Sequence, residues 1–424
     1  MFQKIKKILK SCSKSLMFTY FVLLMVILLP KALVMPSLSF KGLIVTAIGI
    51  DGTVQDIEMS VLALSNISKT DMTENTKVIS GSGTTLANAV FDIEKQIGRG
   101  VRFGHVGYIV FSKRIASDDI TKIINNLIIT TKLPNTISLV MCQDSAKEVL
   151  SLASELEQNS SFKFREMLQN EYNEDYAQET SLDAFLKGYY SAHSSSSLGY
   201  VVVNEDASQG LDANSQTSTK DSSTLSQNQS GNSQGENTQK NNKSVISYKS
   251  EQAVFKNGKY SFTLSKDEME GYNFIVENNL QKIITINNIN TQGLNDATIT
   301  FDILQENLKT NAIIKNGKPK LMYNISLKLK ILEVIDKSGD KISEEEIVIN
   351  NEINQKINNY IKSKLSQLFN TLRKKQTDIV GVYENFETSC GKNFDRFLAN
   401  LQNSDDYLSY IPIFVHTKCK LSSN

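Results

Sequence analysis

The pattern of apolar and polar positions divides the 424 residues into four parts. Residues 1–38 hold a Lys-rich leader and an apolar run, and we predict a cytoplasmic leader followed by a transmembrane or signal segment. Alternating and helical apolar patterns fill 39–204 and 248–424, whereas 205–247 has almost no large apolar side chain. The length fits two or three mixed α/β subdomains. We therefore predict an α+β protein with a membrane-tethered ectodomain.

The apolar run covers residues 16–35, about the length that crosses the hydrocarbon core of a bilayer. Lysines precede it at positions 4, 6, 7, 10 and 14. The positive-inside rule then places the leader in the cytoplasm and the rest of the chain outside. Two interpretations stay open: a retained single-pass anchor, or a signal peptide cleaved near Ser37 or Ser39. A buried core helix is disfavoured because it would not need the lysines.

The region 39–204 opens with "VTAIGIDG" at residues 45–52. Its β-branched run predicts a strand over 44–50, and Asp51-Gly52 predicts a turn into a second strand over 57–64. We interpret Asp51 as a turn residue rather than a catalytic carboxylate. Helical stripes over 84–98, 118–131 and 144–156 alternate with short apolar runs at 106–111 and 136–143, which indicates one compact mixed domain.

Two features of this region could be mistaken for ligand-binding sites. The "GSG" at 81–83 precedes a helix, as phosphate-binding loops do, but no Lys-Ser/Thr follows it and no G-x-G-x-x-G is present. We predict an ordinary loop there. His105 is predicted to be an interior, structural histidine rather than a ligand.

The segment 205–247 is rich in Ser, Asn, Gln and Gly, and it cannot bury enough surface to offset its chain entropy. We predict a disordered insert. After it, "AVFKNGKYSFTL" predicts a hairpin. Two long alternating strands follow, and in the second one face carries Met322, Asn324, Ser326, Lys328 and Lys330.

Ser343 and Glu346 form a capping box that begins a long helix with an Ile/Leu stripe. Its opposite face is basic, at Lys356, Lys362, Lys364, Arg373 and Lys374. That face is either solvated or attracted to an anionic membrane surface. A closing strand is expected near 411–419. The C-terminal region is thus predicted to be a sheet packed on one long helix.

Composition excludes several function classes. The 46 basic and 45 acidic residues leave a net charge of +1, so no basic surplus indicates nucleic acid as a partner. His105, His193 and His416 are far apart, and the four cysteines form no C-x-x-C pair, which argues against a metal site. Cys390 could pair with Cys419. We find no catalytic motif and predict no catalytic, cofactor or metal residues, and so a non-enzymatic binding or structural protein.

Five short motifs, in order, resemble the spore-germination GerC family, the C subunit of nutrient germinant receptors. They are "VTAIGIDG" at 45–52, "GSGTTLANAVFDI" at 81–93, "RFGHVGYIVFSKRIA" at 102–116, "AVFKNGK" at 253–259 and "TDIVGVYENF" at 377–386. Family members usually carry a lipobox cysteine, which "KALVMPSLSFKG" lacks. A plain transmembrane anchor would then replace the lipid.

The resemblance implies a non-enzymatic subunit that assembles with A-type and permease-like B-type receptor subunits. It implies a place at the spore inner membrane, single-pass or signal-anchored, with the ectodomain on the outer face. No catalytic residues are implied. The alternatives are an extracytoplasmic solute-binding or envelope-assembly module and an exported hydrolase.

Overall fold

The computed structural model describes residues 19–20, 42–65, 75–157, 180–193, 195–204, 245–276, 282–291, 294–336 and 351–422. Leu43–Asn424 forms one compact unit, separate from Met1–Gly42. Of the predicted segment 16–35, only Thr19 and Tyr20 are described, and both are helical. The capping box at Ser343 and the predicted insert up to residue 244 also lie outside the described residues.

The opening hairpin is confirmed, but its turn lies further along than the sequence predicted. Strands β1 (Leu43–Thr53) and β2 (Asp56–Ser65) pair antiparallel, with Thr53 opposite Asp56. The turn is therefore at Val54-Gln55, and Asp51 and Gly52 lie within the ladder, opposite Glu58 and Ile57. The prediction of a turn at Asp51-Gly52 was wrong.

In the described part of the chain, the first sheet has ten strands. Its order is β10-β9-β8-β6-β5-β1-β2-β3, with β4 beside β1 and β7 beside β6. The remaining strands are β3 (Asn75–Gly83), β4 (Val101–Arg102), β5 (Tyr108–Ser112), β6 (Ser138–Cys142), β7 (Thr180–Ser181), β8 (Ser195–Asn204), β9 (Val245–Lys256) and β10 (Lys259–Thr263).

The sheet continues beyond the predicted insert. Strand β8 ends at Asn204, which pairs with Val245 at the start of β9, so the insert joins two adjacent antiparallel strands. The β9–β10 hairpin turns at Asn257-Gly258, both with positive φ, as the "NGK" signal predicted. The predicted boundary at residue 248 stays a prediction, since no break in the sheet marks it.

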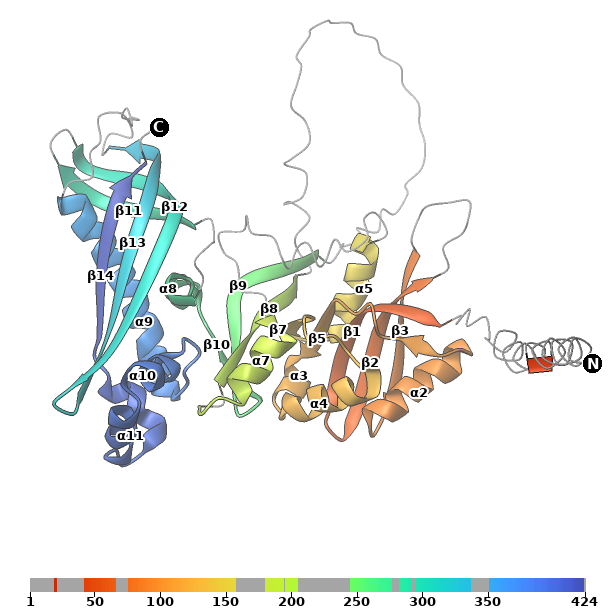
Figure 1. The fold of residues 1–424 in the computed structure, drawn as a ribbon. Coiled ribbons are helices and arrows are strands. Elements are labelled where there is room, and N and C mark those ends of the chain that lie inside the picture. The colour runs from red at the N-terminus through yellow and green to blue at the C-terminus, as the bar shows by residue number, and fades with distance from the viewer. Residues whose placement is uncertain are drawn as a thin grey trace, which may run out of the picture. The chain divides into compact units, whose positions relative to one another are not determined.

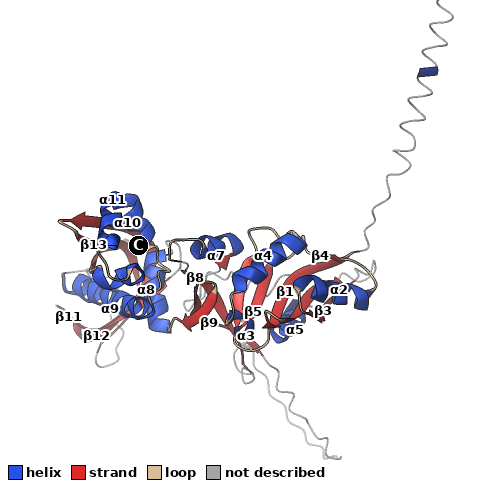
Figure 2. Ribbon diagram, turned by 90° about the horizontal axis from the view of Figure 1, so that it is seen from below, coloured by secondary structure: helices blue, strands red, loops and turns tan. Residues whose placement is uncertain are grey.

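Helices cover both faces of the first sheet (Figure 2). On one face a core joins the sheet to α2 (Leu86–Ile97), α4 (Ile120–Thr131) and α7 (Leu182–Tyr189), together with the short α3 (Lys113–Ala116). On the other face α5 (Ala146–Glu157) packs with Ala146, Val149, Leu150 and Ala153. Because both faces are covered, the central strands β5 and β6 are buried throughout.

The second sheet has the order β11-β12-β13-β14 in the described residues. Strands β11 (Lys282–Thr291), β12 (Leu294–Lys315) and β13 (Lys318–Ile335) are antiparallel neighbours, and β14 (Ile413–Leu421) is parallel to β13. Along β13, Leu321, Tyr323, Ile325, Leu327 and Leu329 are buried, and the residues between them face outward. The predicted alternation is confirmed.

One long helix, α9 (Asn351–Lys375), lies along the inner face of this sheet (Figure 1). The predicted stripe is buried at Ile353, Ile357, Ile361, Leu365, Leu368 and Leu372, and its first member, Ile349, lies outside the described residues. The helix α8 (Lys266–Val276) packs beside it, and α10 (Val382–Cys390), α11 (Lys392–Ala399) and a 3-10 helix (Ser404–Tyr410) follow. The fold is α+β, with a C-terminal sheet on a long helix, and both predictions are confirmed.

Candidate functional site

A buried carboxylate organises the segment that follows α9. Asp378 is 7% exposed. Its carboxylate accepts hydrogen bonds from the backbone N–H groups of Val380 (3.2 Å), Val382 (3.1 Å) and Tyr383 (2.8 Å). The hydroxyl of Tyr407 donates to the same carboxylate. Asp378 thereby satisfies N–H groups at the start of α10, where a negative charge also complements the helix dipole.

Gly381 makes this cap possible. It is the residue that precedes α10, its φ is +69°, and it provides no side-chain cap of its own. A left-handed backbone at this point favours glycine. The Asp-x-x-Gly pattern in "TDIVGVYENF" thus has a physical basis, because the aspartate supplies the cap and the glycine supplies the turn.

Residues of the first sheet contact this cap. The hydroxyl of Ser195, at the start of β8, accepts from the backbone N–H of Asp378 at 3.3 Å. The ring of His193 packs against the rings of Tyr383 and Tyr407, with centroids 4.2 and 4.5 Å apart. We call His193, Ser195, Asp378, Tyr383 and Tyr407 the junction, since they join the two sheets' regions.

The electrostatics of the junction follow from burial. Burial lowers the pKa of His193, and the negative charges of Asp378 and Asp405 oppose the effect only in part. The Nε2 atom of His193 is buried and has no hydrogen-bond partner among the described residues. Burial, reinforced by Asp378, raises the pKa of Tyr407 well above its ordinary value. Tyr407 therefore stays a proton donor to Asp378, beside an imidazole that resists protonation.

One further contact crosses the same boundary. The ammonium of Lys256, at the end of β9, donates to the backbone carbonyl of Gln376 at 2.9 Å. With the Ser195 contact, it ties both ends of the Gln376–Asp378 segment to the first sheet. This arrangement suits positioning of one region on the other.

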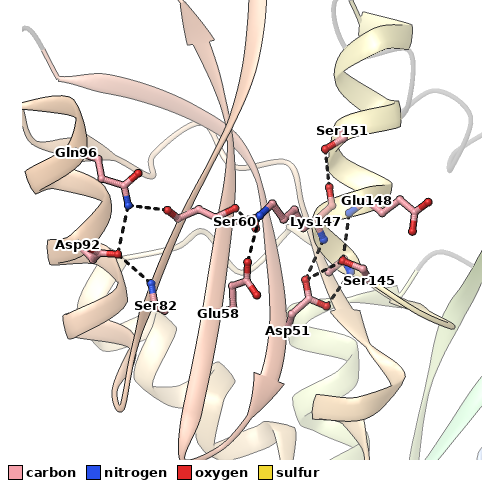
Figure 3. A network of polar contacts seen from close by, with 12 residues as sticks. Asp51, Glu58, Ser60, Ser82, Asp92, Gln96, Ser145, Lys147, Glu148 and Ser151 are labelled. Carbon is pink, nitrogen blue, oxygen red and sulfur yellow. Dashed lines mark hydrogen bonds and ion pairs between the residues drawn. The ribbon is translucent and has the colours of Figure 1, made fainter.

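A second polar network lies across β1, β2 and α5 (Figure 3). Asp51 accepts from the backbone N–H groups of Ala146 (2.9 Å) and Lys147 (3.0 Å), so it caps α5 from a neighbouring strand. Lys147 also reaches Glu58 at 3.3 Å on the exposed surface. Asp51 is thus structural, as predicted, but it serves as a helix cap rather than a turn residue.

The predicted loop at "GSG" is instead the end of strand β3. A Cβ atom on Gly81 would lie 2.5 Å from the carbonyl oxygen of Ala89, and one on Gly83 would lie 2.6 Å from the Cβ of Asn88. Both glycines let α2 approach the strand closely. The N–H of Ser82 donates to Asp92, a carboxylate that would repel phosphate.

The prediction that His105 lies in the interior was wrong, because its side chain is exposed.

Two of the five predicted basic positions on α9 are engaged inside the protein. Lys364 contacts Asp267 and lies 2.8 Å from Glu270, both on α8. Arg373 donates to the carbonyls of Leu408 (3.0 Å) and Ile411 (2.9 Å). The basic face of α9 is therefore partly a packing surface.

The structure also bears on the cysteines, on metal sites and on membrane-spanning helices. Cys142, Cys390 and Cys419 are free thiols, so the pairing of Cys390 with Cys419 is not formed. Within the described ranges, no three or more His, Cys, Asp or Glu side chains are grouped to hold a metal ion. Among those same residues, no helix is both long and apolar enough to span a bilayer.

The sequence analysis missed His193 and Tyr407, because neither residue lies in a recognisable local pattern. Of the residues discussed at the junction, only Asp378 lay in a motif that the sequence analysis had noted.

Comparison with known proteins gives two matches to family models. Residues 42–203 match the spore germination protein N-terminal domain, and residues 250–423 match the C-terminal domain described as spore germination B3/GerAC like. No curated protein matches. The crystal structure of the GerBC protein is similar over 89% of this chain and 97% of its own, at 13% identity and a TM-score of 0.46.

Proposed function

This chain belongs to the GerAC-like family of spore germination proteins, and we propose that it is the non-enzymatic C subunit of a nutrient germinant receptor. The observation that carries the proposal is the pair of family matches, which lie in order and cover most of the chain. The five motifs that resemble the GerC family fall inside the two matched ranges.

We further propose that the subunit assembles with A-type and permease-like B-type subunits at the spore inner membrane. The apolar run at 16–35 behind five lysines supports a membrane tether with the ectodomain on the outer face. Hydrogen bonds and ring contacts connect the two regions at the junction, which supports a receptor role in which movement is transmitted between them. Movement of one region would be passed to the other through these contacts.

The test is a pull-down of the tagged protein from detergent-solubilised spore membranes, with mass spectrometry of the partners and of the protein's own N-terminus. We expect A-type and permease-like subunits to be recovered. An intact peptide from residues 16–35 would indicate a retained anchor, and a chain that begins near Phe40 would indicate cleavage.

A tagged membrane protein of the same spores that is unrelated to germination serves as the matched control. Recovery of neither partner would contradict the receptor proposal. It would favour the alternative, an extracytoplasmic solute-binding or envelope-assembly module, which tight binding of one small molecule would then identify.

A further inference from the structure

A hollow of about 390 Å³ opens on the outer face of the second sheet, opposite α9. Leu327 and Leu421 are part of its lining, and the other six lining residues are outward side chains in two rows across three neighbouring strands. One row is Asn307, Ser326 and Lys418, and the next is Gln305, Lys328 and Lys420. Ser326 is the shortest of the six and stands at the centre of its row, so the longer side chains around it leave a depression.

Positive charge is concentrated at this hollow. Lys328, Lys418 and Lys420 are exposed, and no ion pair to any of the three is found within the described ranges. Lys328 lies directly opposite Lys420 in the ladder. Like charges at directly opposed positions destabilise a sheet, so the arrangement has a cost that a bound anion would relieve.

The acidic groups nearby do not fill the hollow. Glu306 belongs to the same stretch of β12, but it is 8% exposed and pairs with Leu327, which faces α9. Asp302 is on the next row, opposite Lys330. The surplus is local, because the chain as a whole carries only +1.

The neutral groups of the hollow add hydrogen-bond donors. Ser326 offers a hydroxyl, and Asn307 and Gln305 offer amide N–H groups. Three ammonium groups and three neutral donors around one depression fit an anion with several oxygens and more than one negative charge. Lysine binds phosphate as a point charge, and such hydrogen bonds are stronger than those between neutral groups.

We propose that this hollow is a binding site for a phosphate-type anion. The inference stands on the second sheet alone and does not rest on the proposed receptor role. A free phosphate and the headgroup of an anionic phospholipid share the chemistry, and the two are separated by experiment.

The experiment uses the full chain in a non-ionic detergent. Inorganic phosphate is one probe, and short-chain phosphatidylglycerol below its micelle concentration is the other, with the matching phosphatidylcholine as a neutral reference. Binding is measured by isothermal titration calorimetry. We expect saturable binding of at least one anionic probe and none of phosphatidylcholine, with affinity that falls as salt is raised.

The variant K328Q/K418Q/K420Q should lose affinity by about ten-fold or more, since the loss of a single charged hydrogen-bond partner already accounts for about that factor. The control K362Q/K374Q/K392Q removes the same charge at exposed positions elsewhere and should bind like the wild type. Acetylation of the wild-type protein, followed by mass spectrometry, gives a readout that does not depend on a variant's folding. Bound anion should slow the modification of Lys328, Lys418 and Lys420 selectively.

Binding of phosphate would identify a soluble ligand, and binding of phosphatidylglycerol alone would identify a lipid headgroup; each supports the proposal. It is overturned if neither anion binds. It is equally overturned if both triple variants lose binding to the same degree and the three lysines are not protected, because general charge would then explain the effect.

Discussion

At the scale of single residues, the segment after α9 depends on one buried carboxylate, that of Asp378. It accepts three backbone N–H groups and the hydroxyl of Tyr407 at the start of α10. Removal of such a buried acceptor leaves several donors unsatisfied, which is more costly than the loss of one hydrogen bond.

We therefore predict that D378A lowers the free energy of unfolding by about 3 kcal/mol. Chemical denaturation followed by circular dichroism measures the change. The control E387A removes an exposed carboxylate of the same helix and should change stability by less than about 0.5 kcal/mol. Equal stability of the two variants would show that Asp378 does not hold this segment.

His193 gives the junction a dependence on pH. Burial lowers its pKa below the ordinary value of 6.5, so the unfolded chain takes up a proton before the folded protein does. The stability that His193 contributes is present above pH 6.5 and is lost as the pH falls toward the lowered pKa of the folded state.

We predict that stability decreases from pH 7.5 to pH 5.5, and that H193Q shows a smaller decrease than the wild type. Unfolding free energies over this range provide the measurement, and the pH dependence is compared rather than the absolute stability, because H193Q also loses ring contacts. H416Q, a substitution on the exposed surface of β14, should keep the wild-type dependence. An unchanged dependence in H193Q would rule out this role.

At the scale of secondary-structure elements, local sequence patterns predicted whether a segment is a helix or a strand better than they predicted where it ends. The alternation of β13 and the stripe of α9 follow from the periods of strand and helix, and both are as predicted. The turn of the first hairpin was misplaced because Asp51-Gly52 is a strong local turn signal. Asp51 instead caps α5. Because α5 is far from Asp51 in the sequence, no pattern around Asp51 indicates this contact.

The strand β3 shows the same limit. "GSG" predicts a loop by local chemistry, yet its glycines serve the close approach of α2. We predict that G81A destabilises the protein by about 2 kcal/mol, because the added methyl group meets the backbone of α2. Thermal unfolding measures this. G104A is the control, since a Cβ there has no neighbour within 4 Å. A neutral G81A would mean that the helix can shift at little cost.

At the scale of the whole molecule, the candidate sites depend on contacts between distant segments, and the sequence predicted neither. The junction unites residues near 193 with others near 378 and 407. The lysine hollow unites β12, β13 and β14. The outward face of β13 was predicted, with Ser326 and Lys328 on it, but the parallel pairing that adds Lys418 and Lys420 was not.

The insert is expected to be dispensable for the fold. Its ends are held side by side, since Asn204 pairs with Val245. We predict that replacing residues 205–244 by an Asn-Gly turn keeps the protein folded and changes the free energy of unfolding by about 3 kcal/mol or less, because loop entropy varies slowly with length. Thermal unfolding and circular dichroism test this. Loss of the cooperative transition would show that the insert contributes to the core.

The parallel pairing of β13 with β14 also affects the order in which the strands pair during folding. Between these two strands the chain forms α9, α10, α11 and the 3-10 helix. Pairing over such a distance is slow, because the entropy of closure must be lost before any contact is gained. We expect β14 to acquire amide protection after β11, β12 and β13 in pulse-labelling during refolding. Until then the edge of β13 stays open to other strands, which makes this interval the one most prone to aggregation.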